Sequence, residues 1–231
     1  MTIGILQTGK PPSRLALQFG GYSDMFKALL GADHDWRVFD VEAGELPHAP
    51  DACTAYLVTG SSAGVYDDLP WIAPLEGFLR AAKGKAGLVG VCFGHQVMAQ
   101  AFGGRAEKSA KGWGLGLQTY DIAAAAPWMD ASTAIAVPVS HQDQVTAMPD
   151  GARLLGGNAF CPLGLIDYGE GAVSMQCHPE FSPDFAKALL EARRARPDLA
   201  GQAEAAIASL DAPNDNRRVG GWIGAMLFGG S

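Results

Sequence analysis

Apolar runs alternate with amphipathic segments along the first part of the chain. Runs of β-branched and aliphatic residues, typical of buried strands, occupy residues 2–7, 37–41, 55–59 and 88–92. Between and after them, apolar residues recur every three or four positions, as on one face of a helix, at 25–30, 71–82 and 96–102. This alternation predicts an α/β fold, doubly wound, in which helices cover both faces of a mostly parallel sheet.

The pattern changes in the second half of the chain. Residues 115–176 form short apolar runs interrupted by Gly, Pro and Asp, which predicts an antiparallel or mixed extension of the same sheet. Helical spacing returns at 184–194, 203–210 and 223–228. Neither an internal repeat nor a linker-like stretch separates these segments, so we expect one domain with a C-terminal helical tail packed on it.

Composition narrows the class of protein. Of the 231 residues, 48% are hydrophobic and 18% are charged, which is typical of a globular chain and not of a disordered one. The 17 basic and 24 acidic residues leave a net charge of −7, which disfavours nucleic acid as a partner because its phosphates require a basic surface. Since no apolar run reaches the length of a membrane span and no basic region precedes the first one, we expect no membrane association.

Four cysteines, Cys53, Cys92, Cys161 and Cys177, form neither a CxxC pair nor a cluster. A disulfide framework would require a shorter, secreted and more cysteine-rich chain. We therefore expect a soluble, cytoplasmic protein whose thiols remain free in a reducing compartment.

One of these cysteines lies in a distinctive turn. Gly90-Val-Cys92-Phe-Gly94-His-Gln96 passes directly from a buried strand into a helix, which is the setting of a nucleophile elbow with Cys92 as the nucleophile. Glycines two residues before and after it are required because such a tight turn brings other backbone close to both positions. The helix dipole would favour a Cys92 thiolate, and the backbone N–H of Phe93 would face a developing oxyanion.

The other three cysteines lack this setting. A buried, unreactive side chain is the ordinary alternative for any cysteine, and we expect it of Cys53 and Cys161. Cys177 precedes a histidine but should face away from it, because successive residues of an extended strand point to opposite sides.

A candidate base and its partner follow another apolar run, in the segment Gln176-Cys-His178-Pro-Glu180-Phe. Pro179 favours extended backbone at His178, and residues two apart in an extended segment share a face. The Glu180 carboxylate could therefore orient His178 and complete a nucleophile–base–carboxylate triad with Cys92. His95 is a rival base, but its position on the first helical turn favours a packing role.

Four motifs, in this order, resemble those of class I (triad-type) glutamine amidotransferases. They are VTGSSAGVYD at 58–67, GVCFGHQ at 90–96, SHQDQV at 140–145 and QCHPEF at 176–181. Gly20-Gly21-Tyr22, followed by Met25-Phe26, adds a resemblance to stand-alone, GMP-synthase-like members. The resemblance implies a flavodoxin-like sheet and a family domain over residues 1–191, with residues 192–231 as a helical extension on that domain.

The resemblance also implies a reaction. Cys92 would attack the side-chain amide of glutamine, release ammonia and form a γ-glutamyl thioester, which water would resolve with His178 as general base. Glu180 would complete the triad. Two backbone N–H groups, of Gly60 and Phe93, match the positions that form the oxyanion hole in the family.

Further positions follow from the same resemblance. Gln96, Ser140 and His141 match residues that line the glutamine pocket. Where many relatives have Gly-Gly-Pro, this chain reads Gly60-Ser61-Ser62, a change that affects the shape of the loop more than a backbone role of Gly60. No cofactor and no metal ion is implied. Since no ATP-binding element is present, ammonia released from glutamine would pass to a separate synthetase chain.

Three other readings remain open. The same thiol chemistry could cleave γ-glutamyl bonds in peptides such as glutathione conjugates, as in some stand-alone relatives, with loops 8–21 and 108–115 deciding the substrate. A metal hydrolase could use His141-x-Asp143 and His178-x-Glu180 as pairs of ligands, although it leaves the cysteine elbow unexplained. A binding module that kept the pocket without catalysis is the third.

Two glycine-containing segments resemble nucleotide-binding motifs, but each match is incomplete. Gly4–Lys10 fits the first part of a P-loop, but Pro11 replaces the hydroxyl residue that holds magnesium, and Pro12 should block a direct continuation into a helix. Gly112-x-Gly114-x-Gly116 precedes a strand and not a helix, so it is no dinucleotide-binding fingerprint.

Overall fold

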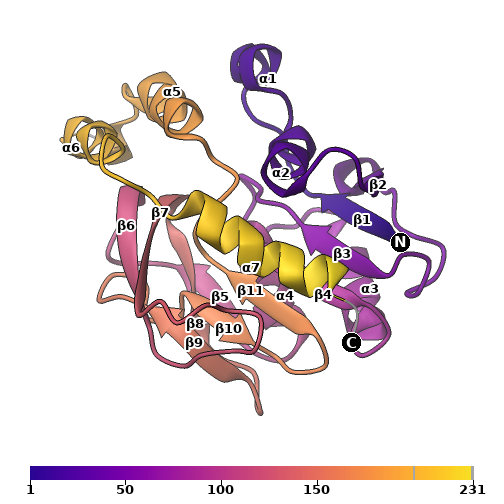
Figure 1. The fold of residues 1–231 in the computed structure, drawn as a ribbon. Helices are drawn as coiled ribbons and strands as arrows, with labels where there is room; N and C mark the ends of the chain where they lie inside the picture. The colour runs from indigo at the N-terminus through magenta and orange to yellow at the C-terminus, as the bar shows by residue number, and fades with distance from the viewer. Residues whose placement is uncertain (200, 230–231) are drawn as a thin grey trace.

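The computed structural model describes residues 1–199 and 201–229. Within them, a nine-stranded sheet runs through the centre of the molecule in the order β2-β1-β3-β4-β11-β10-β9-β6-β7 (Figure 1). Its parallel part consists of β1 (Thr2–Gln7), β2 (Asp35–Asp40), β3 (Ala55–Val58), β4 (Gly87–Val91) and β11 (Ala172–Met175). The predicted parallel sheet is confirmed.

The remaining strands extend this sheet in antiparallel fashion. They are β6 (Gly114–Ile122), β7 (Ala134–His141), β9 (Arg153–Gly157) and β10 (Leu165–Asp167). A separate antiparallel pair consists of β5 (Arg105–Lys108) and β8 (Asp143–Ala147). The mixed extension expected for the second half is therefore present.

Helices cover both faces of the sheet. One face carries α3 (Ile72–Ala82) and α4 (Phe93–Ala101), and the other carries α2 (Tyr22–Leu30) and α7 (Asn216–Phe228) (Figure 1). Three further helices, α1 (Ser13–Phe19), α5 (Pro183–Arg193) and α6 (Ala203–Ser209), pack with one another in a third apolar cluster. Short 3₁₀ turns occupy Val41–Ala43 and Pro197–Leu199.

Alternation along the central strands produces the two main cores. On β3, Tyr56 and Val58 join the cluster under α3 and α4, whereas Ala55 and Leu57 join the cluster under α2 and α7. All four side chains are buried. A strand that is buried on both faces requires a continuous apolar run, which is why these strands are visible in the sequence.

Helix α1 corrects the expectation of an open loop at residues 8–21. The carbonyl oxygen of Pro12 accepts hydrogen bonds from the N–H groups of Leu15 and Ala16, so Pro12 is the N-cap of α1. Pro12 does not block the helix, because proline lacks an N–H that the start of a helix does not need.

Helix α7 begins at Asn216, well before the predicted start at residue 223. Gly220 and Gly221 lower the local helix propensity, so the sequence pattern shows only the last turns. A Cβ on Gly220 would lie 2.9 Å from Leu29 Cδ1, which shows how closely α7 packs on α2. Packing of the tail therefore stabilises a helix that propensity does not favour.

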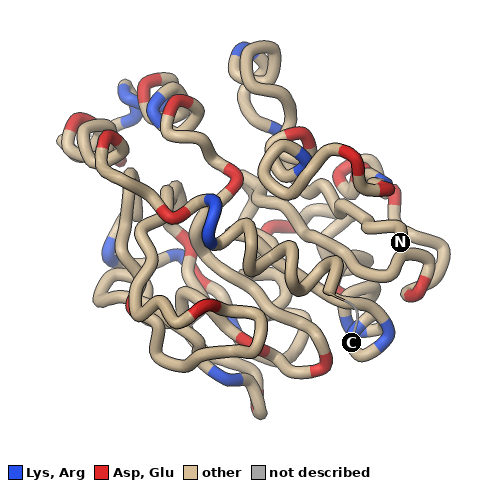
Figure 2. The backbone as a smooth tube through the Cα atoms, in the orientation of Figure 1, with Lys and Arg blue, Asp and Glu red and all other residues tan. Residues whose placement is uncertain are grey.

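Apart from the buried Glu180, the charged residues of the described part of the chain lie towards the periphery of the fold. Acidic and basic positions are interspersed along the outer helices and turns in Figure 2, while β1, β3, β4 and β11 contain no charged residue. Among the described residues, no helix is long and apolar enough to cross a membrane.

Candidate active site

The turn between β4 and α4 has the strained geometry expected of an elbow. Cys92 is the N-cap of α4 and has φ 54° and ψ −104°, a region that L residues rarely adopt. A Cβ on Gly90 would lie 2.5 Å from the carbonyl oxygen of Gly94, and one on Gly94 would lie 2.4 Å from that of Val58. Both glycines are therefore required by close backbone approach.

His178 and Glu180 form a buried pair. His178 Nδ1 lies 2.7 Å from Glu180 Oε1, and the two side chains are 4% and 0% exposed. The ring of His178 also stacks on that of Phe181, with centroids 3.9 Å apart and an interplanar angle of 6°. Two contacts thus hold the imidazole in one orientation.

The charge on His178 depends on its neighbours. Burial opposes the imidazolium, but hydrogen bonding and charge interactions with Cys92 and Glu180 outweigh it and raise the pKa of His178 to about 10. Because Glu180 occupies Nδ1, the other ring nitrogen is left for Cys92. The environment therefore favours a protonated His178 next to the sulfur.

Gly60 lies close to both Cys92 and His178. It follows the end of β3, whereas Cys92 follows β4 and His178 follows β11. A Cβ on Gly60 would lie 3.1 Å from His178 Cε1 and 3.7 Å from Cys92 Cβ. Phe93 is the first residue of α4, where a backbone N–H has no acceptor within the helix. The structure thus brings Cys92, His178, Glu180 and the backbone of Gly60 and Phe93 to one place.

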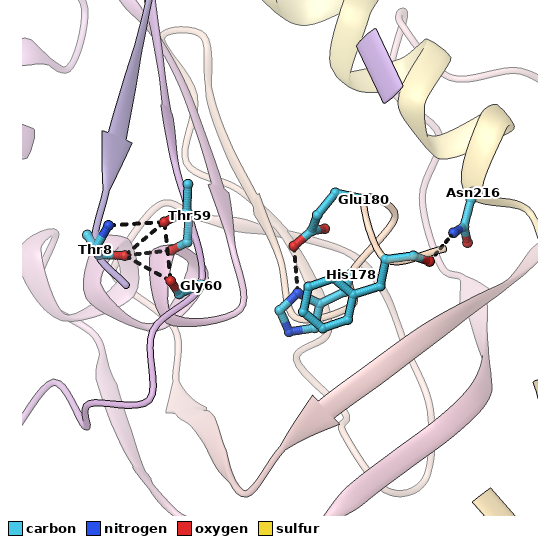
Figure 3. Close-up of polar contacts among 7 residues, drawn as sticks. Thr8, Thr59, Gly60, His178, Glu180 and Asn216 are labelled. Carbon is cyan, nitrogen blue, oxygen red and sulfur yellow. Dashed lines mark hydrogen bonds and ion pairs between the residues drawn. The ribbon is translucent and has the colours of Figure 1, made fainter. Parts of the chain in front are cut away.

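Two threonines that sequence reasoning missed support the Gly60 segment. Thr8 Oγ1 donates to the carbonyl oxygen of Thr59 at 2.9 Å and reaches that of Gly60 at 3.3 Å, and the Thr8 N–H donates to Thr59 Oγ1 at 3.0 Å (Figure 3). Both threonines are fully buried. They follow the adjacent parallel strands β1 and β3, a signal that becomes readable only when the strand order is known.

A cavity of about 270 Å³ opens over Cys92 and His178. All three residues matched to a glutamine pocket, Gln96, Ser140 and His141, line it. Gln96 Nε2 donates to the carbonyl oxygen of Asp143 at 2.9 Å, and His141 Nδ1 donates to the same oxygen at 3.0 Å. Burial lowers the pKa of His141 to about 4, so its imidazole is neutral near pH 7.

The cavity also contains residues to which the sequence assigned no individual role, chiefly Tyr22, Lys108, Trp113 and Arg193. Tyr22 belongs to the Gly-Gly-Tyr motif, and Lys108 and Trp113 belong to the loop expected to decide the substrate, whereas Arg193 carried no sequence signal. These side chains come from α2, the end of β5, the segment before β6, and the end of α5. They converge only in the folded chain.

His95 lies away from the reacting groups. It is fully buried, and its Nδ1 lies 2.7 Å from Ser174 Oγ. Burial lowers the pKa of His95 to about 3. A packing role, and not a role as base, fits this environment.

The other cysteines are free and buried. Cys53 belongs to the core under α3 and α4, and Cys161 and Cys177 to the opposite core. Burial raises the pKa of all three thiols, that of Cys161 to about 12. None has the setting of Cys92.

The His, Cys, Asp and Glu side chains of this region are poorly arranged to bind a metal ion. Within the described part of the chain, no group of three or more His, Cys, Asp or Glu side chains is arranged to hold one. His141 Nδ1 is engaged by a backbone carbonyl, and His178 Nδ1 by Glu180. The two predicted ligand pairs therefore do not combine into a metal site.

Residues 61–193 match the family model of class-I glutamine amidotransferases. The chain belongs to this family. The match includes Cys92, His178 and Glu180, and the resemblance inferred from the four motifs is confirmed.

Two relatives of this chain carry names that differ in the activity they describe. The chain is 29% identical over 191 residues to gamma-glutamyl peptidase 4 of Arabidopsis thaliana, covering 78% of this chain and 76% of the peptidase. It is 30% identical over 139 residues to the glutamine-hydrolyzing GMP synthase of Azoarcus sp., covering 54% of this chain but only 25% of the synthase. The similarity to GMP synthase is thus confined to one part of that larger protein.

The same fold occurs in a solved structure. A glutamine amidotransferase from Thermotoga maritima superposes with a TM-score of 0.75 over 98% of this chain and 96% of that one, at 15% identity. The flavodoxin-like fold expected from the sequence is confirmed.

Proposed function

We propose that this protein hydrolyses the side-chain amide of glutamine through a covalent thioester on Cys92. The observation that supports this most directly is that Cys92 and His178 line one cavity, with Glu180 paired to His178 and the backbone of Gly60 close to both. Membership of a glutamine amidotransferase family supports the same reaction.

The chemistry follows from the charges at the site. The Cys92 thiolate attacks the amide carbon, and the N–H groups of Gly60 and Phe93 stabilise the oxyanion that develops. The His178 imidazolium gives its proton to the departing ammonia. The neutral imidazole then activates a water molecule that resolves the γ-glutamyl thioester, while Glu180 keeps the ring oriented.

The pocket residues have a separate role in this proposal. Gln96 and His141 are tied to the same backbone carbonyl, that of Asp143, so they form a rigid wall. Ser140, at the position before His141, lines the same cavity, and its hydroxyl accepts a hydrogen bond from Arg193. At about 270 Å³ the cavity lies below the range of about 300–1,000 Å³ typical of drug-sized ligands, which suits an amino acid or a small peptide.

A γ-glutamyl peptidase is the second candidate. The similarity to an Arabidopsis gamma-glutamyl peptidase, at 29% identity over most of both chains, favours it. The acyl part of the substrate and the thioester are the same in both reactions. Only the leaving amine differs, being ammonia from glutamine and an amino acid or peptide from the alternative substrate.

We also propose a partner and a cellular location for this reaction. If ammonia is the useful product, a separate synthetase subunit would receive it, as the match to one part of a GMP synthase suggests. We place the reaction in a reducing compartment such as the cytoplasm, because a thiol nucleophile and three further free cysteines remain reduced there.

The test measures ammonia, glutamate and amine release from L-glutamine and from γ-glutamyl peptides. We expect Cys92→Ala to lower kcat by at least about 10³-fold on every substrate, and Cys53→Ala, in the opposite core from the elbow, to retain activity. Rapid peptide cleavage with glutamine turnover near background would establish the second candidate. Activity that survives Cys92→Ala, or a Cys92 thiol no more readily alkylated than the other three, would contradict a thiol mechanism.

A further inference from the structure

Arg193 is a cation without a carboxylate partner in the active-site cavity. It is the last residue of α5 and lines the same cavity as Cys92 and His178. Its Nη1 donates to Ser140 Oγ at 3.1 Å. None of the ion pairs formed by the described residues includes Arg193.

Its neighbours on the same segment differ in this respect. Arg194 is exposed and pairs with Glu191 and Glu204. Arg196 pairs with Asp198 at 2.8 Å and lies over the ring of Trp113. Only Arg193 of these three points its charge into the cavity without a counterion.

Burial makes this arrangement costly. Arg193 is half-buried, and desolvation, together with the nearby charge of Arg196, lowers the pKa of its guanidinium. The guanidinium has five N–H donors, and the side chain of Ser140 satisfies one of them. A ligand carboxylate would supply both the missing charge and the missing acceptors.

We propose that Arg193 binds a carboxylate of the substrate and so selects amino-acid-like γ-glutamyl compounds over simple amides. The inference rests on the proposed function for the identity of its ligand. A γ-glutamyl compound has an α-carboxylate on its glutamyl part, and a γ-glutamyl peptide has a second carboxylate at the end of its leaving group. Either one presents the planar pair of oxygens that a guanidinium binds in bidentate fashion.

Binding without turnover tests this inference. Dissociation constants are measured by calorimetry with Cys92→Ala protein for L-glutamine, γ-glutamylglycine and γ-glutamylglycinamide, the last of which lacks the terminal carboxylate. We expect the additional change Arg193→Gln to weaken binding about 10- to 100-fold, and Arg193→Lys, which keeps the charge but loses the fork, to weaken it less. Arg194→Gln, one residue away and exposed, is the matched control and should leave binding unchanged.

The three ligands identify the carboxylate. Weaker binding of all three assigns Arg193 to the α-carboxylate, whereas weaker binding of γ-glutamylglycine alone assigns it to the terminal carboxylate. Unchanged binding of all three, equal losses in Arg194→Gln, or no measurable binding to the Cys92→Ala protein would overturn the inference. Because no turnover is needed, a failure of the proposed hydrolysis would be seen separately, in the ammonia and glutamate assay.

Discussion

The backbone at Cys92, with φ 54° and ψ −104°, costs a non-glycine residue about 1–3 kcal/mol. The surrounding contacts enforce this conformation. The N–H of Cys92 donates to the carbonyl oxygen of Met175 at 2.9 Å, and that of Gly94 donates to the carbonyl oxygen of Thr59 at 3.2 Å. Met175 at the end of β11 and Thr59, directly after β3, therefore help to set the position of the sulfur.

A methyl group added at Gly94 tests how tightly the backbone packs around the turn at Cys92. Gly94→Ala would place a carbon 2.4 Å from the backbone oxygen of Val58, so we expect the free energy of unfolding in urea to fall by about 1–3 kcal/mol. Gly77→Ala is the control, because Gly77 is exposed within α3 and nothing lies within 4 Å of its added Cβ. It should raise stability by about 0.5–1 kcal/mol. Equal effects of the two changes would contradict the packing argument.

The charge of Glu180 should be visible in the pH dependence of the reaction. Glu180→Gln removes one of the charges that raise the pKa of His178, so this pKa should fall from about 10. In the proposed mechanism, activity requires the imidazolium and should be lost as pH rises through the pKa of His178. The alkaline limb of kcat/KM against pH should therefore move to lower pH, with a loss of at least about tenfold near neutrality.

The control for this experiment is Glu191→Gln, an exposed carboxylate on α5. It should leave both the rate and the position of the alkaline limb unchanged. An alkaline limb that stays in place in Glu180→Gln would show that Glu180 does not control the charge of His178.

At the scale of elements, helix α7 of the C-terminal extension contacts the loop that carries His178. Asn216 Nδ2 donates to the carbonyl oxygen of Phe181 at 2.7 Å, and the ring of Phe181 stacks on His178 (Figure 3). Asp215 also exchanges two hydrogen bonds with the backbone of Ala136 on β7, at 2.7 and 2.8 Å. The start of α7 is thus connected to His178, in the candidate active site, through Phe181.

We expect Asn216→Leu to affect both stability and activity. It leaves the buried carbonyl of Phe181 unpaired, which should cost about 1–3 kcal/mol in urea unfolding. The loosened ring of Phe181 should lower kcat by about tenfold while changing KM less, because the pocket walls from α4 and β7 are untouched. Arg217→Ala, the exposed neighbour on α7, should match the wild-type protein in both measurements. A normal kcat in Asn216→Leu would show that α7 supports the fold alone.

At the scale of the whole molecule, three buried histidines make stability depend on pH in both directions. The pKa values of His95 and His141 are lowered to about 3 and 4, whereas that of His178 is raised to about 10. Below about pH 6.5, His95 and His141 become protonated in the unfolded chain but stay neutral in the folded protein. The unfolded state therefore binds more protons, and acid lowers the free energy of unfolding. The contribution of His178 is complete below about pH 6.5 and is lost as pH rises toward 10.

The free energy of unfolding should therefore be highest near pH 6.5 and fall toward both pH 4.5 and pH 9.5. Urea titrations at the three pH values measure this. In His95→Asn, which removes one titrating group, the fall between pH 6.5 and 4.5 should be less steep, by at most about 1.4 kcal/mol per pH unit. An unchanged acid slope in His95→Asn would show that His95 is not responsible for the acid instability.

Much of the fold was predictable because its central strands are apolar on both faces. The runs at β1, β3 and β4 agree with the structure to within one residue, and the Cys92 elbow follows from glycines that only such a turn requires. Helix α1 was missed because it is short and follows two prolines. The start of α7 was missed because Gly220 and Gly221 lower the helix propensity of this segment. Contact with α2, and not local propensity, stabilises the helix there.

The sequence by itself determined the fold class, the order of the motifs and the residue types that could react, since local periodicity and turn sterics depend on neighbours along the chain. The tertiary structure alone decided which strand ends meet. It placed Thr8 beside Thr59 and Gly60, and it brought Arg193 into the cavity of Cys92. Such contacts join residues far apart in the chain, and their geometry follows from strand order and helix packing.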